Sequence, residues 1–334
     1  MNHHRYFLGV DAGGSKTQAL IVDENGNAVG FQGGGPGNWE GIGLGRLTNV
    51  LKRTIHQALK MATINIQQIA GAGLGLAGYD WPSQREMILG AIQPIGLKCS
   101  LEIVNDASLG IFAGTSEGWG VSVVSGTGCN CRGWSKDRKR KGRMVGGGSD
   151  WSCEYAGGYD IVARAMRAVT FEWNKRGPAT ALSQAFLEMS GAQNLDELVE
   201  GVYVGRYNFE PSYVLKVFEV ASRGDPAAID VIRWAGEELG QMACGVIRQL
   251  ECEDELVEVV LIGSLFDGHS LMTESLRSTV LNVAAKAKLV RLSAPPVVGG
   301  ALLGMEQVLG QQAYCMNARV IETTRALIKQ NDKQ

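Results

Sequence analysis

The sequence predicts an α/β protein made of two similar halves, each built around a mixed β-sheet. The chain has 334 residues, which exceeds the usual size of a single domain. Short apolar runs alternate with segments whose apolar residues have helical spacing, as expected for sheets covered by helices. A pattern of strand, glycine turn and strand begins at Tyr6 and again near Gly120. This restart indicates an internal duplication.

The first half begins with an antiparallel meander. Tyr6–Val10, Thr17–Val22 and Ala28–Gln32 are predicted strands, and Asn25-Gly26 is the strongest two-residue hairpin signal. After the glycine-rich loop GGGPGNWEGIG, a helix, strand, helix, strand and helix are predicted at 44–62, 69–78, 81–95, 100–106 and 107–114. Three strands followed by alternating helices and strands are typical of a mixed sheet.

The second half repeats this order with longer helices. Strands are predicted at 120–125 and 129–135 on either side of the turn GTG, and a long helical stretch fills 161–250. Strands at 257–264 and 287–293 and helices at 271–285, 295–304 and 317–330 complete the prediction.

Composition narrows the class of protein. A formal net charge of −2 gives no overall attraction for nucleic acid or an anionic membrane. The basic run Ser135–Arg143, which includes Lys136–Arg143, is predicted to be the solvated tip of a turn, with binding of an anionic partner as the alternative. Seven scattered cysteines and the lack of a long apolar segment predict a cytoplasmic protein without a membrane or nucleic-acid partner.

The glycine turn Gly13–Thr17 differs from the common phosphate loops. Val10 stands where a Walker A loop needs its first glycine, and the segment after Thr17 is a strand rather than a helix. Consecutive backbone N–H groups in such a turn can still form an anion-binding nest, and Asp11 at its entrance can reach Mg²⁺ through water. The alternative is a plain glycine-rich turn. The second turn, Ser125–Gly128, favours phosphate binding, because two facing turns could clamp one polyphosphate.

Asp106 is the candidate general base. It ends a predicted buried strand and precedes a helix, so it should lie at the carboxyl edge of the sheet, where open α/β sheets bind ligands. Phosphoryl transfer to an alcohol needs a group that receives the hydroxyl proton. The alternative role for Asp106 is an N-cap, which is compatible with the first.

Five motifs carry a family resemblance: GVDAGGSKT, VNDASLG, SGTGCNCRGW, VVLIGSLFDG and PPVVGGALLG. In this order they resemble the actin/Hsp70/sugar-kinase superfamily, and most closely its N-acetylglucosamine kinase and BadF/BadG/BcrA/BcrD ATPase branch, from Leu8 to about Gly304. The resemblance implies two ribonuclease-H-like domains, each with a mixed five-stranded sheet, and a nucleotide cleft between them. The expected domains are 1–117 and 118–309, followed by a C-terminal helix at 310–334 that packs on the first domain.

The resemblance also implies roles for individual residues. Asp106 would be the catalytic aspartate, and Asp11 would hold Mg²⁺ through water. Residues expected on the ATP phosphates are Gly13, Gly14, Ser15, Lys16, Thr17, Gly126, Thr127 and Gly128, with Gly263 and Ser264 near adenosine. Residues expected on the sugar are Asn38, Trp39, Asp106, Asn130, Gly147, Gly148 and Glu154, with Asp150 as the alternative acidic contact.

The predicted function is an ATP- and Mg²⁺-dependent kinase of an amino sugar that forms a 6-phosphate. Ala77 replaces a serine of the similar kinases, and their Gly-Asp-Glu-Gly pattern is absent, so N-acetylglucosamine, glucosamine and another hexose remain as acceptors. A symmetric homodimer is the default expectation. The alternatives are an iron–sulfur ATPase activator of a reductase or dehydratase, for which only the pair Cys129 and Cys131 is present, and a sugar-sensing regulator.

Overall fold

The computed structural model describes residues 4–145 and 154–331 and divides into two compact units. Unit 1 comprises Met1–Ser122, Gly133–Arg140 and Val290–Gln334, and unit 2 comprises Val123–Arg132 and Lys141–Leu289. The units divide the chain differently from the predicted boundaries after residues 117 and 309, because residues 290–309 belong to unit 1. Within the described ranges, no helix combines the length and the apolar character needed to cross a membrane.

The first sheet lies in unit 1 and has the order β3-β2-β1-β4-β5. Its strands are β1 (Tyr6–Ala12), β2 (Thr17–Asp23), β3 (Ala28–Gly34), β4 (Ile69–Leu76) and β5 (Ser100–Val104). β1 pairs antiparallel with β2 and parallel with β4, so the sheet is mixed, as predicted. The Ala12–Thr17 pair closes the glycine turn. The carboxyl ends of β1, β4 and β5 share one edge of the sheet.

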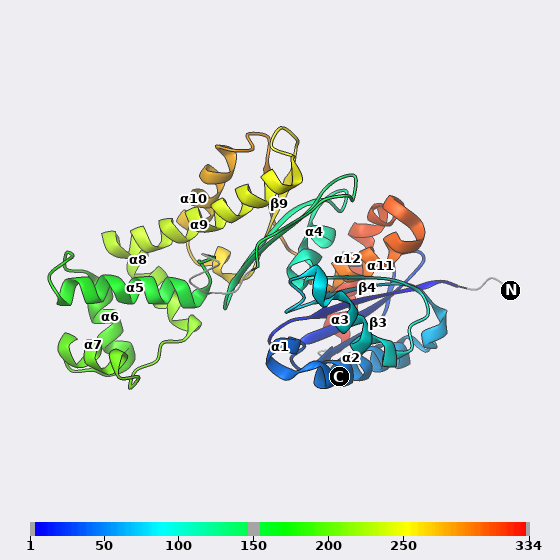
Figure 1. The fold of residues 1–334 in the computed structure, drawn as a ribbon, viewed down its shortest axis with the longest axis horizontal. Helices are drawn as coiled ribbons and strands as arrows, with labels where there is room; N and C mark the ends of the chain where they lie inside the picture. Colours follow the sequence, from blue (N-terminus) through cyan, green and yellow to red (C-terminus); the bar gives the residue numbers. More distant parts are fainter. Residues whose placement is uncertain (1–3, 146–153, 332–334) are drawn as a thin grey trace. The chain divides into compact units, whose positions relative to one another are not determined.

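Helices cover both faces of this sheet (Figure 1). Leu8 and Val10 of β1 join a core with the buried face of α2 (Leu44–Ala62) and with α3 (Arg85–Ile92). Phe7 and the opposite face pack against α4 (Leu109–Gly114) and α11 (Val297–Leu309). Alternate residues of a strand point to opposite faces, which is why one strand serves two cores.

Helix α11 packs unusually close to the sheet because both surfaces are rich in glycine. A Cβ added at Gly73 would overlap the carbonyl oxygen of Gly300, and one at Gly9 would overlap the backbone of Ala301. Glycine allows this approach of helix to strand at the expense of chain entropy. The glycine-rich predicted strand at 69–78 therefore has a packing role.

Helix α12 (Asn317–Asn331) packs on the first sheet beside β3. The Thr323 hydroxyl accepts a hydrogen bond from the Ala28 backbone N–H at 3.0 Å and donates to the Gly26 carbonyl at 3.2 Å. The Arg319 side chain donates to Asn27 at 2.8 Å. The C-terminal helix thus contributes to unit 1.

The second sheet has the order β10-β9-β6-β7-β8. Its strands are β6 (Gly120–Ser125), β7 (Cys129–Trp134), β8 (Lys141–Arg143), β9 (Glu258–Ile262) and β10 (Lys288–Arg291). Counted along the chain, its five strands are arranged like those of the first sheet, with the first strand between the second and the fourth. This correspondence confirms the predicted pair of five-stranded sheets and supports the internal duplication.

The basic run Ser135–Arg143 is not a solvated tip throughout. The Arg138 side chain is only 21% exposed; its Nε pairs with Glu306 at 2.7 Å, and its Nη1 donates to the Gly118 carbonyl at 2.6 Å. Lys141–Arg143 forms β8. The prediction was wrong for Arg138, because its partner Glu306 lies 168 residues away in the sequence.

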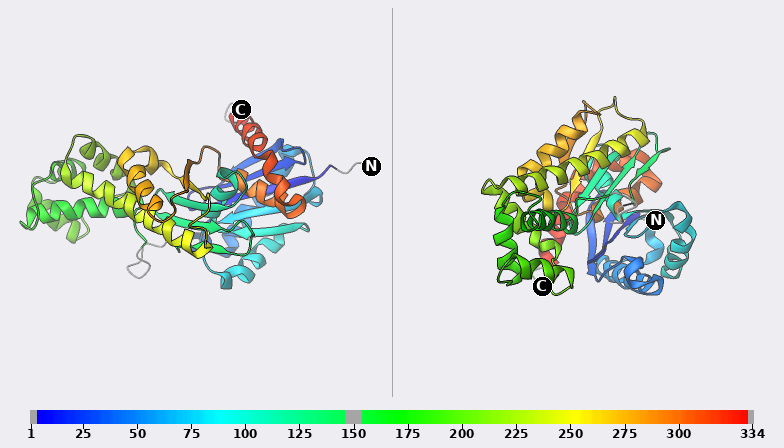
Figure 2. Two further views of the ribbon diagram at one scale, coloured as in Figure 1. Left: turned by 90° about the horizontal axis from the view of Figure 1, so that it is seen from above. Right: turned by 60° about the vertical axis from the view of Figure 1, so that its left-hand side comes forward.

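Unit 2 carries a group of helices between β8 and β9. These are α5 (Gly158–Trp173), α6 (Ala181–Ser190), α7 (Leu195–Tyr203), α8 (Val214–Ser222) and α9 (Pro226–Leu250), and α10 (Ser270–Leu281) follows β9. Helices α5, α6 and α7 lie side by side (Figure 2), and α9 packs along α10.

Candidate functional site

The first glycine turn leaves its tip open. The Gly13 backbone N–H donates to the Lys16 carbonyl at 2.9 Å, and the Gly13 carbonyl accepts from the Gly37 N–H at 2.9 Å. No atom lies within 4 Å of a Cβ added at Gly14, and Ser15 and Lys16 are exposed. The Thr17 hydroxyl is buried and makes no hydrogen bond to any residue that the structure describes. The turn thus offers open backbone and a buried polar group.

Two carboxylates accompany this turn. Asp11 lies in β1, and Asp106 begins a short 3₁₀ helix directly after β5. Asp106 Oδ2 lies 3.7 Å from the position of a Cβ on Gly13. The pKa of Asp11 is raised from its ordinary value of 3.8 to about 7, mainly by burial and also by the charge of Asp106, while the charge of Lys16 opposes the shift. A proton or a cation therefore stabilises Asp11.

Asn105, and not Asp106, is the N-cap of the helix after β5, so the alternative role considered for Asp106 falls to its neighbour. The Asn105 side-chain oxygen accepts from the Ala107 N–H at 3.0 Å, as the N-cap of the helix Asp106–Ser108. Asp106 Oδ1 accepts from the same N–H at 3.0 Å, and its Oδ2 faces the glycine turn. Asp106 is therefore the first residue of the helix, one position after its cap.

The loop after β3 brings Asn38 and Trp39 against the end of β4. Asn38 is the N-cap of α1 (Trp39–Ile42), and its side chain accepts from the Glu40 N–H at 3.1 Å. The Trp39 indole N–H donates to the Gly78 carbonyl at 2.9 Å. Gly78 has a φ of +80°, and any side chain there would overlap Asn38 and Trp39. Both predicted sugar residues thus lie in unit 1 with Asp106.

Two further acidic residues were missed by the sequence analysis. Asp80 accepts a hydrogen bond from the Asn105 amide at 3.0 Å, so it lies beside the residue that precedes Asp106. Partial burial raises the pKa of Glu40, and the nearby charge of Asp80 raises it further. The only sequence signal for a role was position: Glu40 directly follows Asn38-Trp39, and Asp80 follows the glycine-rich strand β4.

The second glycine turn, in unit 2, packs against the start of α5. The Gly126 N–H donates to the Gly128 carbonyl at 2.9 Å, and the Gly126 carbonyl accepts from the Gly158 N–H at 2.8 Å. A Cβ on Gly157 would overlap the backbone of Gly128, and Gly263, with a φ of +106°, lies against the Ser125 carbonyl. The structure therefore brings the expected adenosine residues Gly263 and Ser264 to the same part of unit 2 as this turn.

The remaining predicted sugar residues are only partly described. Asn130 lies half-buried in β7, and Glu154 is 5% exposed and accepts from the Val145 N–H at 2.7 Å. Gly147, Gly148 and Asp150 fall outside the described residues. The choice between Glu154 and Asp150 as the acidic contact stays a prediction.

The cysteines of β7 are inert in their surroundings. Burial raises the pKa of the Cys129 thiol to about 12, with the charges of Asp160 and Glu154 adding to the shift, and burial also raises the pKa of Cys131. Within residues 4–145 and 154–331, no three His, Cys, Asp or Glu side chains gather as a metal-binding group. Burial therefore disfavours the thiolate form of both cysteines.

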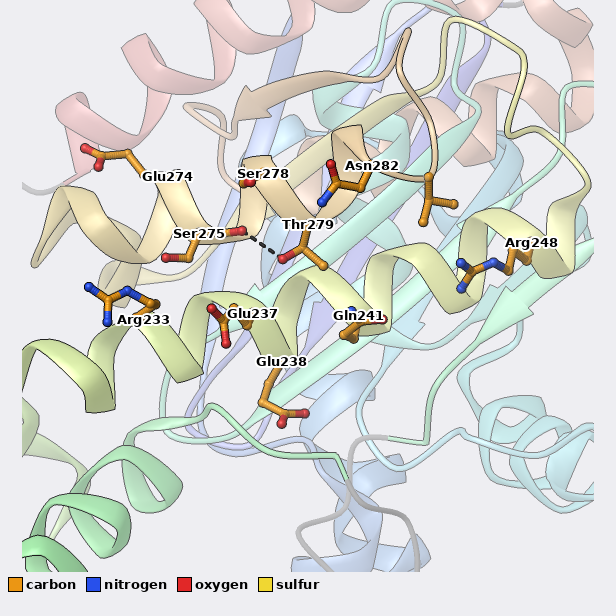
Figure 3. A pocket seen from close by; sticks show the side chains of 11 residues that line it. Arg233, Glu237, Glu238, Gln241, Arg248, Glu274, Ser275, Ser278, Thr279 and Asn282 are labelled. Atoms are coloured by element: carbon orange, nitrogen blue, oxygen red, sulfur yellow. Dashed lines mark hydrogen bonds between the residues drawn. The ribbon is translucent and has the colours of Figure 1, made fainter. Parts of the chain in front are cut away.

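A separate groove of about 680 Å³ runs between α9 and α10 (Figure 3). Its lining is polar and charged, from Arg233, Glu237 and Gln241 on one helix to Glu274 and Asn282 on the other. The two helices approach closely at Gly236 and Gly240. None of the predicted site residues lines this groove.

The comparisons with known proteins agree with these motifs. Residues 8–304 match the family model described as the BadF/BadG/BcrA/BcrD ATPase family. The chain belongs to this family. Membership in the BadF/BadG/BcrA/BcrD ATPase family makes ATP its nucleotide.

Two curated relatives match nearly the whole chain. An N-acetylmuramic acid/N-acetylglucosamine kinase of Clostridium acetobutylicum is 24% identical over 307 residues, which cover 91% of this chain and 99% of the relative. An N-acetyl-D-glucosamine kinase of Dictyostelium discoideum is 23% identical, with 90% and 97% covered.

Solved structures share the fold of this BadF/BadG/BcrA/BcrD ATPase family member. A Chromobacterium violaceum protein described as an N-acetylglucosamine kinase has a TM-score of 0.63 at 22% identity, covering 90% of this chain and 99% of its own. A ROK family glucokinase from Streptomyces griseus, solved with glucose and AMPPNP, has a TM-score of 0.54 at 17% identity, covering 90% and 99%. These similarities confirm the predicted fold class.

Proposed function

We propose that this protein is an ATP-dependent kinase that transfers the γ-phosphate of ATP to a hydroxyl of an amino sugar, N-acetylglucosamine or glucosamine, and forms a 6-phosphate. The observation that carries the proposal is the position of Asp106, whose Oδ2 faces Gly13 of the open glycine turn at the carboxyl edge of the sheet. The names of the two curated relatives support the sugar class. A cytoplasmic location and a homodimer belong to the same proposal.

The glycine turns suit the phosphates of ATP. Added Cβ atoms at Gly14, Gly126 and Gly128 would meet no atom within 4 Å, so the backbone there is open to a ligand. In the proposal, Gly13–Thr17 and Gly126–Gly128 bind phosphate oxygens through backbone N–H groups. The buried Thr17 hydroxyl, which makes no hydrogen bond within the described ranges, gives the first turn one more polar group. Gly263 and Ser264 are proposed to contact adenosine.

Asp11 suits a hydrated magnesium ion. Its pKa of about 7 shows that the ionised form lacks full compensation in the protein alone. In the proposal, Asp11 holds Mg²⁺ through the ion's water shell, and the ion would offset the phosphate charge. Lys16 provides a further positive charge near Asp11.

Asp106 is proposed to receive the proton of the sugar hydroxyl that attacks the γ-phosphate. A carboxylate within hydrogen-bond reach of the attacking hydroxyl can orient it and accept its proton, while positioning and charge stabilisation supply most of the catalysis. Asn105 and the Ala107 N–H hold Asp106 at the start of its helix. Asn38, Trp39, Asn130 and the segment Gly147–Glu154 are proposed to orient the sugar. Exclusion of water from the bound substrates would limit ATP hydrolysis.

The acidic pair Glu40 and Asp80 bears on the choice of acceptor. Asp80 raises the pKa of Glu40, so a positive charge nearby would stabilise both carboxylates. The ammonium group of glucosamine carries such a charge, whereas the acetamido group of N-acetylglucosamine is neutral. The pair therefore favours glucosamine among the two proposed acceptors.

A coupled ADP-release assay tests the function. The sugars are N-acetylglucosamine, glucosamine, N-acetylmannosamine, N-acetylmuramic acid and glucose, each with ATP and Mg²⁺. We expect ADP release that depends on an amino sugar, and its loss in Asp106→Ala. Slow ATP hydrolysis that no sugar stimulates would contradict the kinase proposal.

The alternative activator function would need Cys129 and Cys131 to hold an iron–sulfur cluster, and both side chains are buried in β7. Iron analysis of protein purified without oxygen distinguishes the kinase function from the activator function. The kinase proposal expects a colourless, iron-free protein, and a brown, oxygen-sensitive one would favour the activator.

A further inference from the structure

Unit 2 contains a hollow that the proposed reaction does not use. It lies between α5 and α9 and has a volume of about 300 Å³, which is at the lower end of the range for small-molecule sites. Its lining consists of Tyr155, Asp160, Ala163, Arg164, Arg167, Trp234 and Glu238. None of these residues has a role in the proposed transfer.

Two arginines give the hollow its positive charge. Arg164 and Arg167 are three residues apart on α5, so their side chains share one face of the helix. Neither guanidinium makes a hydrogen bond or ion pair with the residues that the structure describes. Burial lowers the pKa of Arg164, and the charge of Arg167 lowers it further, against opposition from Glu238 and other carboxylates. An anion placed between the two guanidiniums would relieve this repulsion.

Aromatic rings form the apolar part of the hollow. The Arg164 guanidinium lies 4.2 Å from the centre of the Trp234 ring. The Tyr155 ring lies 6.5 Å from Trp234, centre to centre. Aromatic faces next to charged groups suit ligands with one apolar and one charged part, as carbohydrate phosphates have.

Two carboxylates complete the set. Glu238 Oε1 accepts from the Trp234 indole N–H at 3.0 Å, and Asp160 Oδ2 accepts from the Ala156 and Gly157 N–H groups at 3.1 and 2.9 Å. The second oxygen of each carboxylate makes no hydrogen bond within the described ranges. Glu238 lines this hollow and also the groove between α9 and α10 (Figure 3). These oxygens can accept hydrogen bonds from an ammonium group or hydroxyls.

The hollow connects directly to the second glycine turn. Asp160 accepts from the Gly157 N–H, and the next residue, Gly158, donates to the Gly126 carbonyl at 2.8 Å. A ligand bound to Asp160 is therefore linked through two hydrogen bonds to a turn that is proposed to bind ATP. This short path provides a physical route from the hollow to the nucleotide.

We infer that this hollow binds an amino-sugar phosphate, the class of product that the proposed function forms. Arg164 and Arg167 bind the phosphate, Trp234 and Tyr155 contact the apolar face of the sugar, and Asp160 and Glu238 bind its ammonium group or hydroxyls. The inference rests on the proposed function for the identity of the ligand. Occupation of the hollow inhibits the enzyme through Gly157-Gly158, so the product limits its own formation.

Calorimetry with glucosamine 6-phosphate tests the site. Saturating glucosamine and AMPPNP first occupy the reaction site of the full-length protein, and the sugar phosphate is then titrated. We expect binding to the wild type that weakens at least tenfold in Arg164→Gln/Arg167→Gln. The matched control is Arg233→Gln, an exposed arginine on α9 outside this hollow, which should bind within twofold of the wild type.

Initial rates supply a second readout. Inhibition by glucosamine 6-phosphate should persist at saturating glucosamine in the wild type and disappear in the double variant, whose uninhibited rate stays unchanged. Equal binding by the double variant and the wild type would overturn the inference, as would equal affinity for inorganic phosphate alone. If the wild type phosphorylates no sugar but binds glucosamine 6-phosphate, and the double variant does not bind it, the proposed function is refuted and the proposed site is supported.

Discussion

The two glycine turns use the same backbone device in different surroundings. In each, the carbonyl of the first glycine accepts an N–H from a glycine elsewhere in its unit: Gly37 donates to Gly13, and Gly158 donates to Gly126. Gly37 lies two residues before the four-residue α1, and Gly158 is the first residue of the sixteen-residue α5. The likeness extends from strand order to individual hydrogen bonds, as expected for a duplicated unit.

The difference lies in the acidic groups. The first turn has Asp11 and Asp106 beside it, with the pKa of Asp11 raised to about 7. At the second turn, Asp160 is engaged with the backbone at the start of α5, and Gly263 packs against the strand end. We interpret the first turn as the one that serves the chemistry and the second as the one that holds the nucleotide. A duplicated backbone can thus acquire two roles through its neighbouring side chains.

The largest expected effect of breaking the second turn comes from Gly157→Ala. The added Cβ would overlap the backbone of Gly128, which cannot move aside like a flexible side chain. We expect kcat/KM for ATP to fall by about 10³-fold, or about 4 kcal/mol in transition-state binding. Steady-state kinetics measure this, with circular dichroism to verify folding.

Gly90→Ala is the matched control, because a Cβ there meets no atom within 4 Å. It should leave kcat/KM within twofold. A Gly157→Ala enzyme as active as this control would remove the second turn from nucleotide binding.

Asp11→Asn sharpens the comparison through pH. The pKa of Asp11 is about 7 in the folded protein against an ordinary value of 3.8, so the folded state binds this proton more tightly than the unfolded state. The stabilisation from this proton is fully present below pH 4 and is lost as the pH rises towards 7. The loss in free energy of unfolding is at most about 4 kcal/mol. Without ligands, Asp11→Asn should therefore be more stable than the wild type at pH 8, and the difference should shrink at pH 5.

Urea denaturation at the two pH values, without nucleotide or Mg²⁺, measures the free energy of unfolding. If the difference in free energy of unfolding between wild type and Asp11→Asn is the same at both pH values, the pKa of Asp11 is not raised in the folded protein.

The smallest effect concerns Asn38, which follows the glycine that braces the first turn. Loss of its cap in Asn38→Ala should cost about 1 kcal/mol of stability. Asn38→Ser keeps a capping oxygen and should retain stability, while the KM for the sugar rises about tenfold because the amide is lost. Thermal melts and sugar kinetics separate the two roles. If serine restores the KM as well, Asn38 is a cap and nothing more.

Local features of the structure were predictable from the sequence. The hairpin signal Asn25-Gly26 excluded a helix after Thr17, and the apolar spacing of 44–62 matched α2 residue for residue. Asp106 was expected at the carboxyl edge of the sheet because it ends a predicted strand. In the structure it is the first residue of the short 3₁₀ helix that follows β5. Hairpins, helices and strand ends are determined by residues close together in the sequence, through local sterics and the periodicity of apolar side chains.

The contacts that the sequence did not reveal are long-range. The neighbourhood of Asp80 and Glu40 depends on loops forty residues apart meeting at Gly78, and the packing of α11 on the first sheet joins residues 73 and 300. The pairing of Arg138 with Glu306 spans 168 residues. Spacing and composition carry no information about such pairs, so the two glycines that donate to the turns, Gly37 and Gly158, were also missed.

ATP affinity in two variants tests the division of roles most directly. Isothermal calorimetry with Asp106→Ala should give a Kd for ATP within threefold of the wild type, although this variant transfers no phosphate. The same titration with Gly157→Ala should give a Kd at least a hundredfold weaker. Tight binding by Gly157→Ala together with loss of ATP binding in Asp106→Ala would reverse the assignment and contradict the account.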